Sequence, residues 1–283
     1  MSWQSPHQRP LPDWQARPLI MGILNVTPDS FSDGGQLPTA ESVAERAEQL
    51  IAEGADILDL GAESTRPGAT PVGADTELAR LLPAIAAIRR RLPMAPLSVD
   101  TYKAAVASAC VAAGVDVVND VEGGGFEAYQ QASPMAKACA QLGCPLILMH
   151  RRKEAIAVDF WPEILGEVRG LLHRALANGM KAEQVWIDPG FGFGKTPAQN
   201  LMMVRNLERF AGLGFPVLLG TSRKSTLGLV LNQPDPLGRH DGTATTAVWG
   251  IAQGAAMVRV HEVARIKPFV TMAGALRQAP KGP

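Results

Sequence analysis

The sequence predicts a single (β/α)8 barrel. One unit repeats along the chain: a helix, a glycine, a short apolar run and a polar residue. Short strands that are apolar throughout are typical of a parallel sheet buried on both faces, and their alternation with helices gives an α/β fold. The 283 residues also suit such a barrel, which takes about 250 residues in one domain. A doubly wound open sheet is the alternative.

Eight apolar runs are the predicted strands: 19–24, 57–60, 97–99, 117–120, 145–149, 185–187, 216–219 and 257–260. The segments between them have helical spacing of apolar residues, for example Leu81, Ile85 and Ile88. A glycine precedes six of the runs, where a helix commonly ends in a left-handed residue. Pro83 interrupts one helical pattern, so we expect a kink or a new start there.

We expect a barrel domain at 19–277, an irregular N-terminal extension at 1–18 and a C-terminal tail at 278–283. The extension contains Trp3 and Trp14, which are candidates to pack on the barrel at a place that the sequence does not specify. It lacks the apolar core of a signal peptide, and no run approaches the length of a membrane span. These features predict a cytoplasmic protein without a membrane partner.

Charge and cysteine content exclude several other classes. The formal net charge is +0, which argues against nucleic acid as the main partner. The three cysteines have neither metal-ligand nor redox spacing, and their sparse, odd count fits a reducing cytosol. Small molecules are therefore the expected partners.

Almost every predicted strand ends in a polar side chain. In barrels of this type the carboxyl ends of the strands form the active site. Charges that converge in a partly buried cleft lose hydration, so we expect a ligand to meet them. The residues at these ends are Asn25, Asp59, Asp100, Asn119, His150, Asp188, Arg223 with Lys224, and Arg259 with His261.

Two sets can be separated by their chemistry. Asp100, Asn119 and Asp188 are rich in acceptors and suit a flat heterocycle with an amidine-like donor edge. A second set suits a phosphate and a Mg²⁺ ion held by oxygen ligands; it consists of Asn25, Arg259 and His261. Lys224 could serve either set, and no Ser-His-Asp or Cys-His nucleophile pattern is present. The residues therefore predict a heterocyclic substrate that carries a phosphate leaving group.

The stretch Asp188–Lys195 reads DPGFGFGK and follows a predicted strand. Its three glycines would let the backbone adopt positive φ and approach a ligand closely. It resembles a nucleotide P-loop, but three residues separate Gly190 from Gly194 where that motif needs four. A tight turn without a ligand is the alternative. Two further stretches, Asn25–Gly35 and Glu63–Gly68, are long, rich in glycine and small polar residues, and are predicted to be mobile lids.

Five motifs in order resemble the dihydropteroate synthase family. They are 21–35, 54–68, 188–195, 221–225 and 259–261, and the resemblance extends from Met21 to about Leu276. It implies a (β/α)8 barrel that joins 6-hydroxymethyl-7,8-dihydropterin diphosphate to 4-aminobenzoate and releases diphosphate and 7,8-dihydropteroate. It also implies Mg²⁺, a homodimer and competition by sulfonamides with 4-aminobenzoate.

The resemblance assigns residues to each substrate. For the pterin it implies Asp100, Asn119, Met149, Asp188 and Lys224. For diphosphate it implies Asn25, which would also bind the metal, with Arg66, Arg259 and His261. For the aminobenzoate it implies Phe31, Ser32, Thr65, Pro67, Phe193, Lys224 and Ser225. Asp33 would stabilise a developing cation in a dissociative mechanism, so the catalytic set is Asp33, Lys224, Arg259 and His261.

Some residues depart from the family pattern. Ala62 stands where glycine is usual, and Glu122 where a small residue is usual. The basic run 151–153 is expected to be a solvated loop; the alternative is that it attracts the anionic substrate. The basic run 89–91, at the end of a predicted helix, is also expected to be solvated.

Two other functions stay open on these residues. A corrinoid-linked methyltetrahydrofolate methyltransferase should lack the 25–35 loop and the 222–225 motif, which are both present. A degenerate pterin-binding barrel fits the two departures, but intact Asn25, Asp33, Lys224 and His261 weigh against it.

Overall fold

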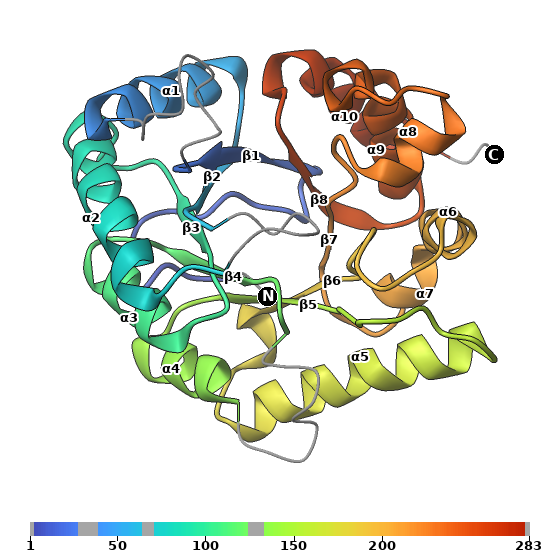
Figure 1. Ribbon diagram of the computed structural model, residues 1–283, viewed down its shortest axis with the longest axis horizontal. Coiled ribbons are helices and arrows are strands. Elements are labelled where there is room, and N and C mark those ends of the chain that lie inside the picture. Colours follow the sequence, from blue (N-terminus) through green and yellow to red (C-terminus); the bar gives the residue numbers. More distant parts are fainter. Residues whose placement is uncertain (1–2, 28–38, 64–70, 124–132, 281–283) are drawn as a thin grey trace.

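The computed structural model describes residues 3–27, 39–63, 71–123 and 133–280. Within these ranges, parallel strands form a closed barrel in which each strand pairs with the next and β8 pairs with β1 (Figure 1). The (β/α)8 prediction is confirmed, and the open-sheet alternative is wrong. The strands are β1 (Leu19–Asn25), β2 (Ile57–Gly61), β3 (Leu97–Asp100), β4 (Val117–Asp120), β5 (Leu146–Met149), β6 (Val185–Asp188), β7 (Val217–Leu219) and β8 (Ala255–Val260).

Helices surround the ring of strands (Figure 1). They are α1 (Ala40–Glu53), α2 (Ala74–Arg91), α3 (Ala104–Ala112), α4 (Pro134–Leu142), α5 (Phe160–Ala177), α6 (Pro197–Arg205), α7 (Glu208–Ala211), α8 (Ser225–Val230), α9 (His240–Ala252) and α10 (Val263–Gln278). α2 continues through Pro83, so the expected new start is not observed. None of the described helices is both long and apolar enough to cross a membrane.

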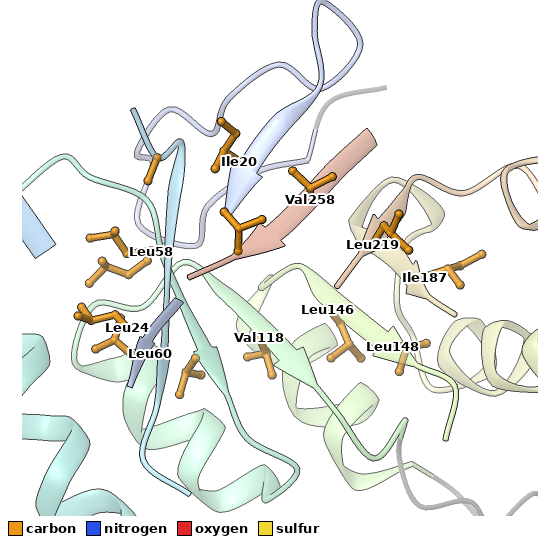
Figure 2. Packing of buried hydrophobic residues seen from close by; sticks show 14 of the residues in the cluster. Ile20, Leu24, Leu58, Leu60, Val118, Leu146, Leu148, Ile187, Leu219 and Val258 are labelled. Carbon is orange, nitrogen blue, oxygen red and sulfur yellow. The ribbon is translucent and has the colours of Figure 1, made fainter. Parts of the chain in front are cut away.

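Period-two alternation along the strands divides the core into two layers. Outward side chains such as Leu58, Val118 and Leu148 belong to the larger cluster, which packs beneath the helices (Figure 2). The inward side chains fill the part of the barrel nearer the amino ends of the strands, and include Leu19, Met21, Ile57, Val117, Ile147, Trp186, Leu218 and Met257. The barrel interior below the site is therefore a packed apolar core.

The N-terminal segment closes the amino end of the barrel. Trp3 is buried and its ring centroid lies 4.6 Å from that of Trp186, while Trp14 lies 5.7 Å from the same ring. Residues 3–18 thus pack on the end of the barrel opposite to the carboxyl ends of the strands.

The fully buried carboxylate of Asp116 ties this segment to the barrel. It accepts hydrogen bonds from Ser5, from Arg9 and, over 2.7 Å, from Arg89. The expectation that the run 89–91 is solvated is therefore wrong for Arg89. Burial lowers the pKa of Arg89 to about 10, and the carboxylate opposes that shift.

Candidate active site

The strand register brings the predicted acceptor residues to one level of the barrel. Asn25 pairs with Gly61, Gly61 pairs with Asp100, and Asp100 pairs with Asn119. On the other side of the ring, Met149 pairs with Asp188. On β2, β4, β6 and β8, the polar residue comes two positions after an inward-facing apolar residue, so its side chain also points into the barrel, near the carboxyl ends of the strands.

A hydrogen-bond network joins four strands, β8, β2, β3 and β4, at this level. Arg259 donates from Nε to Asp59 Oδ2 over 2.6 Å and from Nη2 to Asp100 Oδ2 over 2.7 Å. Asn119 Nδ2 also donates to Asp59 Oδ2, over 3.0 Å. Arg259, predicted to meet an anion, thus lies among the acceptors predicted to meet a heterocycle.

Asp59 is the residue of this network whose role sequence reasoning missed. It lies inside β2, not at its end, and its side chain is fully buried. Its second oxygen, Oδ1, and the carbonyl oxygen of Asn119, Oδ1, have no hydrogen-bond partner within the described residues. Buried acceptors are nearly always paired, so two unused acceptor atoms indicate where a ligand donates.

In this network, burial and the charge of an ion-pair partner act in opposite directions on the pKa values of Asp100 and Arg259. Burial raises the pKa of Asp100 to about 7, although the guanidinium of Arg259 opposes the shift. The pKa of Arg259 lies above its usual value because Asp59 and Asp100 outweigh the effect of burial. The site therefore favours a ligand that donates hydrogen bonds to carboxylates.

Asp188 stands at the end of β6 with its side chain turned into the site. Its Oδ1 accepts the backbone N–H of Gly190 over 2.7 Å, and burial raises its pKa. Gly220 lies between Asp188 and Arg259, since a Cβ at residue 220 would make ordinary contacts with Asp188 Oδ2 at 3.7 Å and Arg259 Cβ at 3.9 Å.

Lys224 and Phe193, which are both expected to meet the second substrate, lie close together. Lys224 Nζ lies 4.3 Å from the centroid of the Phe193 ring and donates to the carbonyl oxygen of Phe191. Burial lowers the pKa of Lys224 to about 8, and nearby Asp188 opposes that shift. Ser225, the first residue of α8, is exposed beside this pair.

His261 is held by Ser222, a residue to which no separate role was assigned from the sequence. Its Nδ1 lies 2.9 Å from Ser222 Oγ, and its backbone N–H donates to the same oxygen over 3.3 Å. Ser222 thereby fixes the ring orientation of His261 at the end of β8.

Asn25 offers an oxygen ligand at the rim of the site. A Cβ on Gly61 would lie 3.5 Å from Asn25 Oδ1 and 3.7 Å from Asp100 Oδ2, so these two oxygens flank the same point. Within the described residues, no three or more His, Cys, Asp or Glu side chains form a group that could hold a metal ion. Mg²⁺ commonly takes one or two protein oxygens together with substrate phosphates and water, and this donor set fits that pattern.

The glycines after Asp188 are required by the protein's own backbone. A Cβ at Gly190 would lie 1.8 Å from the carbonyl oxygen of His150, and one at Gly194 would lie 2.2 Å from that of Arg152. Both glycines have positive φ, +72° and +61°. The close approach predicted toward a ligand is in these two cases an approach to the loop after β5.

His150 does not belong to the ring of site residues. It is fully buried, and its Nε2 lies 2.5 Å from Glu167 Oε2 on α5. Arg152 pairs with Glu163 and Glu167, also on α5. The solvated-loop expectation for 151–153 is thus wrong for Arg152.

Glu122, one of the two departures from the family pattern, contacts the basic run 151–153. Arg151 forms an ion pair with Glu122, and its guanidinium lies 5.6 Å from the Phe193 ring centroid. Ala62 is fully buried, and its carbonyl oxygen accepts from Arg80 over 2.7 Å. Neither departure disturbs the network around Asp59.

Six predicted residues lie outside the described part of the chain: Phe31, Ser32, Asp33, Thr65, Arg66 and Pro67. A surface depression of about 530 Å³ occurs elsewhere, between residues 10–12 and the loop 91–96. It lies at the amino end of the barrel, and none of the converging polar groups described above line it. The candidate site is therefore the carboxyl end.

Comparison with known proteins gives consistent matches. The family model described as "Pterin binding enzyme" matches residues 21–261. Dihydropteroate synthase of Bacillus subtilis (strain 168) is 42% identical over 93% of this chain and 90% of its own length. Among solved structures, dihydropteroate synthase from Clostridium difficile, with pteroic acid, is 40% identical with a TM-score of 0.86, over 93% of this chain and 98% of that one. The Xanthomonas albilineans enzyme with 4-aminobenzoic acid is 40% identical, with a TM-score of 0.85, over 93% and 94%.

Proposed function

Because the chain belongs to the dihydropteroate synthase family, we propose that it condenses 6-hydroxymethyl-7,8-dihydropterin diphosphate with 4-aminobenzoate by a dissociative route. The observation that carries the pterin assignment is the pair of buried, unused acceptors, Asp59 Oδ1 and Asn119 Oδ1. A pterin presents a flat edge of ring N–H and amino donors. These donors would pair with the acceptors of the network and with Asp188.

Asp59 takes part in this proposal as a positioning residue. Its Oδ2 accepts from both Asn119 and Arg259, so it fixes the direction of the Asn119 amide and leaves that residue's carbonyl oxygen as the acceptor. Asp100 and Asp188 would supply the charged acceptors. Hydrogen bonds to charged groups contribute about 1.5–3 kcal/mol each, which suits a site that must orient a ring.

Departure of diphosphate would come first. Arg259 and His261 lie at the end of β8 and would stabilise the charge on the leaving group, together with Arg66. Asn25 would hold Mg²⁺ with the diphosphate oxygens, and the bound ion would neutralise part of the phosphate charge. The sequence has no Ser-His-Asp or Cys-His pattern that would support a covalent intermediate, so the amine of 4-aminobenzoate would attack the pterin cation directly.

The aminobenzoate would bind beside Phe193, where the ring and the Lys224 ammonium offer an aromatic face and a cation for a carboxylate. Ser225 lies next to Lys224, and Phe31, Ser32, Thr65 and Pro67 would complete the pocket. A sulfonamide has the same shape and would compete there.

Asp33 would place a carboxylate near the pterin cation, which exists only close to the transition state. We therefore expect Asp33→Asn to lower kcat by about 10²-fold, while the Kd for the diphosphate substrate changes by less than about threefold. Calorimetric titration with that substrate and turnover of the same variant are the measurements. If the Kd and kcat change in parallel, or if neither changes, this role of Asp33 is wrong.

A cytoplasmic homodimer is the proposed assembly. α9 and α10 pack against each other and carry exposed apolar side chains, among them Trp249, Phe269, Met272 and Leu276. The last three lie three to four residues apart on α10, so they share one face. An apolar helical face of this kind suits a second copy of the chain.

A further inference from the structure

The side chain of Lys195 folds back beneath the glycine loop, which we define as residues 188–195. Its Nζ donates to the carbonyl oxygens of Gly190 over 3.0 Å, Phe193 over 2.9 Å and His150 over 3.3 Å. It also lies 3.0 Å from His150 Nδ1. One ammonium thus joins two positions of the glycine loop to the end of β5.

The two ring nitrogens of His150 have different partners, and these determine its tautomer. The carboxylate of Glu167 lies 2.5 Å from Nε2, so Nε2 carries the proton and Nδ1 presents its lone pair to the ammonium of Lys195. Burial lowers the pKa of His150 to about 4, which agrees with a neutral ring. Arg152 holds the other oxygen of Glu167 over 2.7 Å. A continuous chain of contacts therefore runs from α5 to the glycine loop.

The part of the loop that Lys195 holds carries Phe193, which is proposed above to meet 4-aminobenzoate. Phe193, whose carbonyl oxygen binds Lys195, presents its ring to the Lys224 ammonium at 4.3 Å. The carbonyl oxygen of Phe191, between the two positions held by Lys195, accepts a hydrogen bond from Lys224. Asp188, in contrast, is part of β6 and is fixed by pairing with β5. Loss of the ammonium should therefore affect Phe191 and Phe193 more than Asp188.

We propose that Lys195 is a positioning residue for 4-aminobenzoate binding, because its ammonium fixes the Phe191–Phe193 segment against His150 and so sets the geometry of Phe193 and Lys224. This inference rests on the proposed function for the identity of the second substrate. Its structural part, the fixing of the loop by the ammonium, holds independently of any reaction.

Several charged groups face Lys195, and together they make its charge dependent on pH. Burial lowers its pKa to about 7; the charges of Asp188 and Glu167 oppose the shift, whereas Lys224 and Arg152 add to it. A neutral amine has only two N–H donors for the four acceptors, so the segment loosens as pH rises above about 7.

The first test compares Lys195→Met with Lys181→Met, a matched change at an exposed lysine. We expect Lys195→Met to raise the KM for 4-aminobenzoate by at least about tenfold, because buried carbonyls lose their donor, and to change the Kd for the pterin substrate by less than about threefold. Lys181→Met should match the wild type. Equal losses for both substrates, or unchanged kinetics, would overturn the positioning role.

Amide hydrogen exchange measures the fixing of the loop directly and does not depend on enzyme activity. In Lys195→Met without substrates, the amides of residues 191–193 should exchange at least about tenfold faster, while those of β6 keep their wild-type protection. Unchanged exchange in 191–193 contradicts the proposal. An inactive wild type with this exchange pattern would instead contradict the proposed function alone.

A milder variant covers the case in which Lys195→Met does not fold. Glu167→Gln keeps the shape of the partner of His150 but removes a negative charge that favours the protonated form of Lys195. The KM for 4-aminobenzoate should therefore begin to rise at a lower pH than in the wild type. No displacement, or displacement to higher pH, would contradict the proposal.

Discussion

Asp188→Asn is expected to lower kcat/KM by about 10²-fold or more in a protein that stays folded, through the loss of about 3 kcal/mol of hydrogen bonding to the pterin. The amide keeps an oxygen for the N–H of Gly190, which the carboxylate now binds over 2.7 Å. Its NH2 group, however, replaces the other acceptor and faces the donor edge of the ring, and the negative charge is lost. Steady-state kinetics with varied pterin diphosphate measures the effect.

A suitable control is Asp75→Asn, which makes the same chemical change at an exposed position of α2. It should leave kcat/KM unchanged. Thermal unfolding of both variants separates loss of function from loss of fold. Wild-type kinetics in a folded Asp188→Asn variant would show that Asp188 has only a structural role.

Gly190→Ala is expected to destabilise the protein by about 3 kcal/mol or more and to abolish most activity. The new Cβ would lie 1.8 Å from the carbonyl oxygen of His150, and main-chain atoms of the barrel cannot move away as a flexible side chain can. Positive φ adds about 1–2 kcal/mol for any residue with a Cβ. Denaturant unfolding gives the change in the free energy of unfolding.

Gly143→Ala separates the two causes. Gly143 has φ of +65°, close to the +72° of Gly190, but a Cβ there would meet nothing within 4 Å. Gly143→Ala should therefore lower the free energy of unfolding only by the cost of positive φ, about 1–2 kcal/mol. Equal destabilisation of the two variants would mean that close packing against His150 does not explain Gly190.

The sequence predicted the fold well because period-two and helical patterns are local. The same alternation put Asp100, Asn119 and Asp188 at strand ends, and parallel pairing then brought them to one level. The strand-end rule failed for His150. This residue is the first after β5, and its side chain turns outward to Glu167, since consecutive side chains at a strand end point to opposite sides.

Contacts between distant segments could not be predicted. Asp59 was recognised as polar, but its bonds to Asn119 and Arg259 span 60 and 200 residues. Arg89 was expected to be solvated, but it bonds to Gly114 and Asp116, which lie 25 and 27 residues away in the next unit of the barrel. Lys195 was assigned only to a glycine motif, and its position beneath the loop follows from three-dimensional packing with α5.

The most direct test of the central claim is a product assay with purified protein, Mg²⁺, pterin diphosphate and 4-aminobenzoate. We predict that 7,8-dihydropteroate and diphosphate form in equal amounts, and that no dihydropteroate forms without the amine. Chromatography of the pterin products with parallel measurement of diphosphate gives both values. A folded protein that binds the pterin substrate but forms no dihydropteroate with both substrates and Mg²⁺ would contradict the account and favour a barrel that only binds pterins.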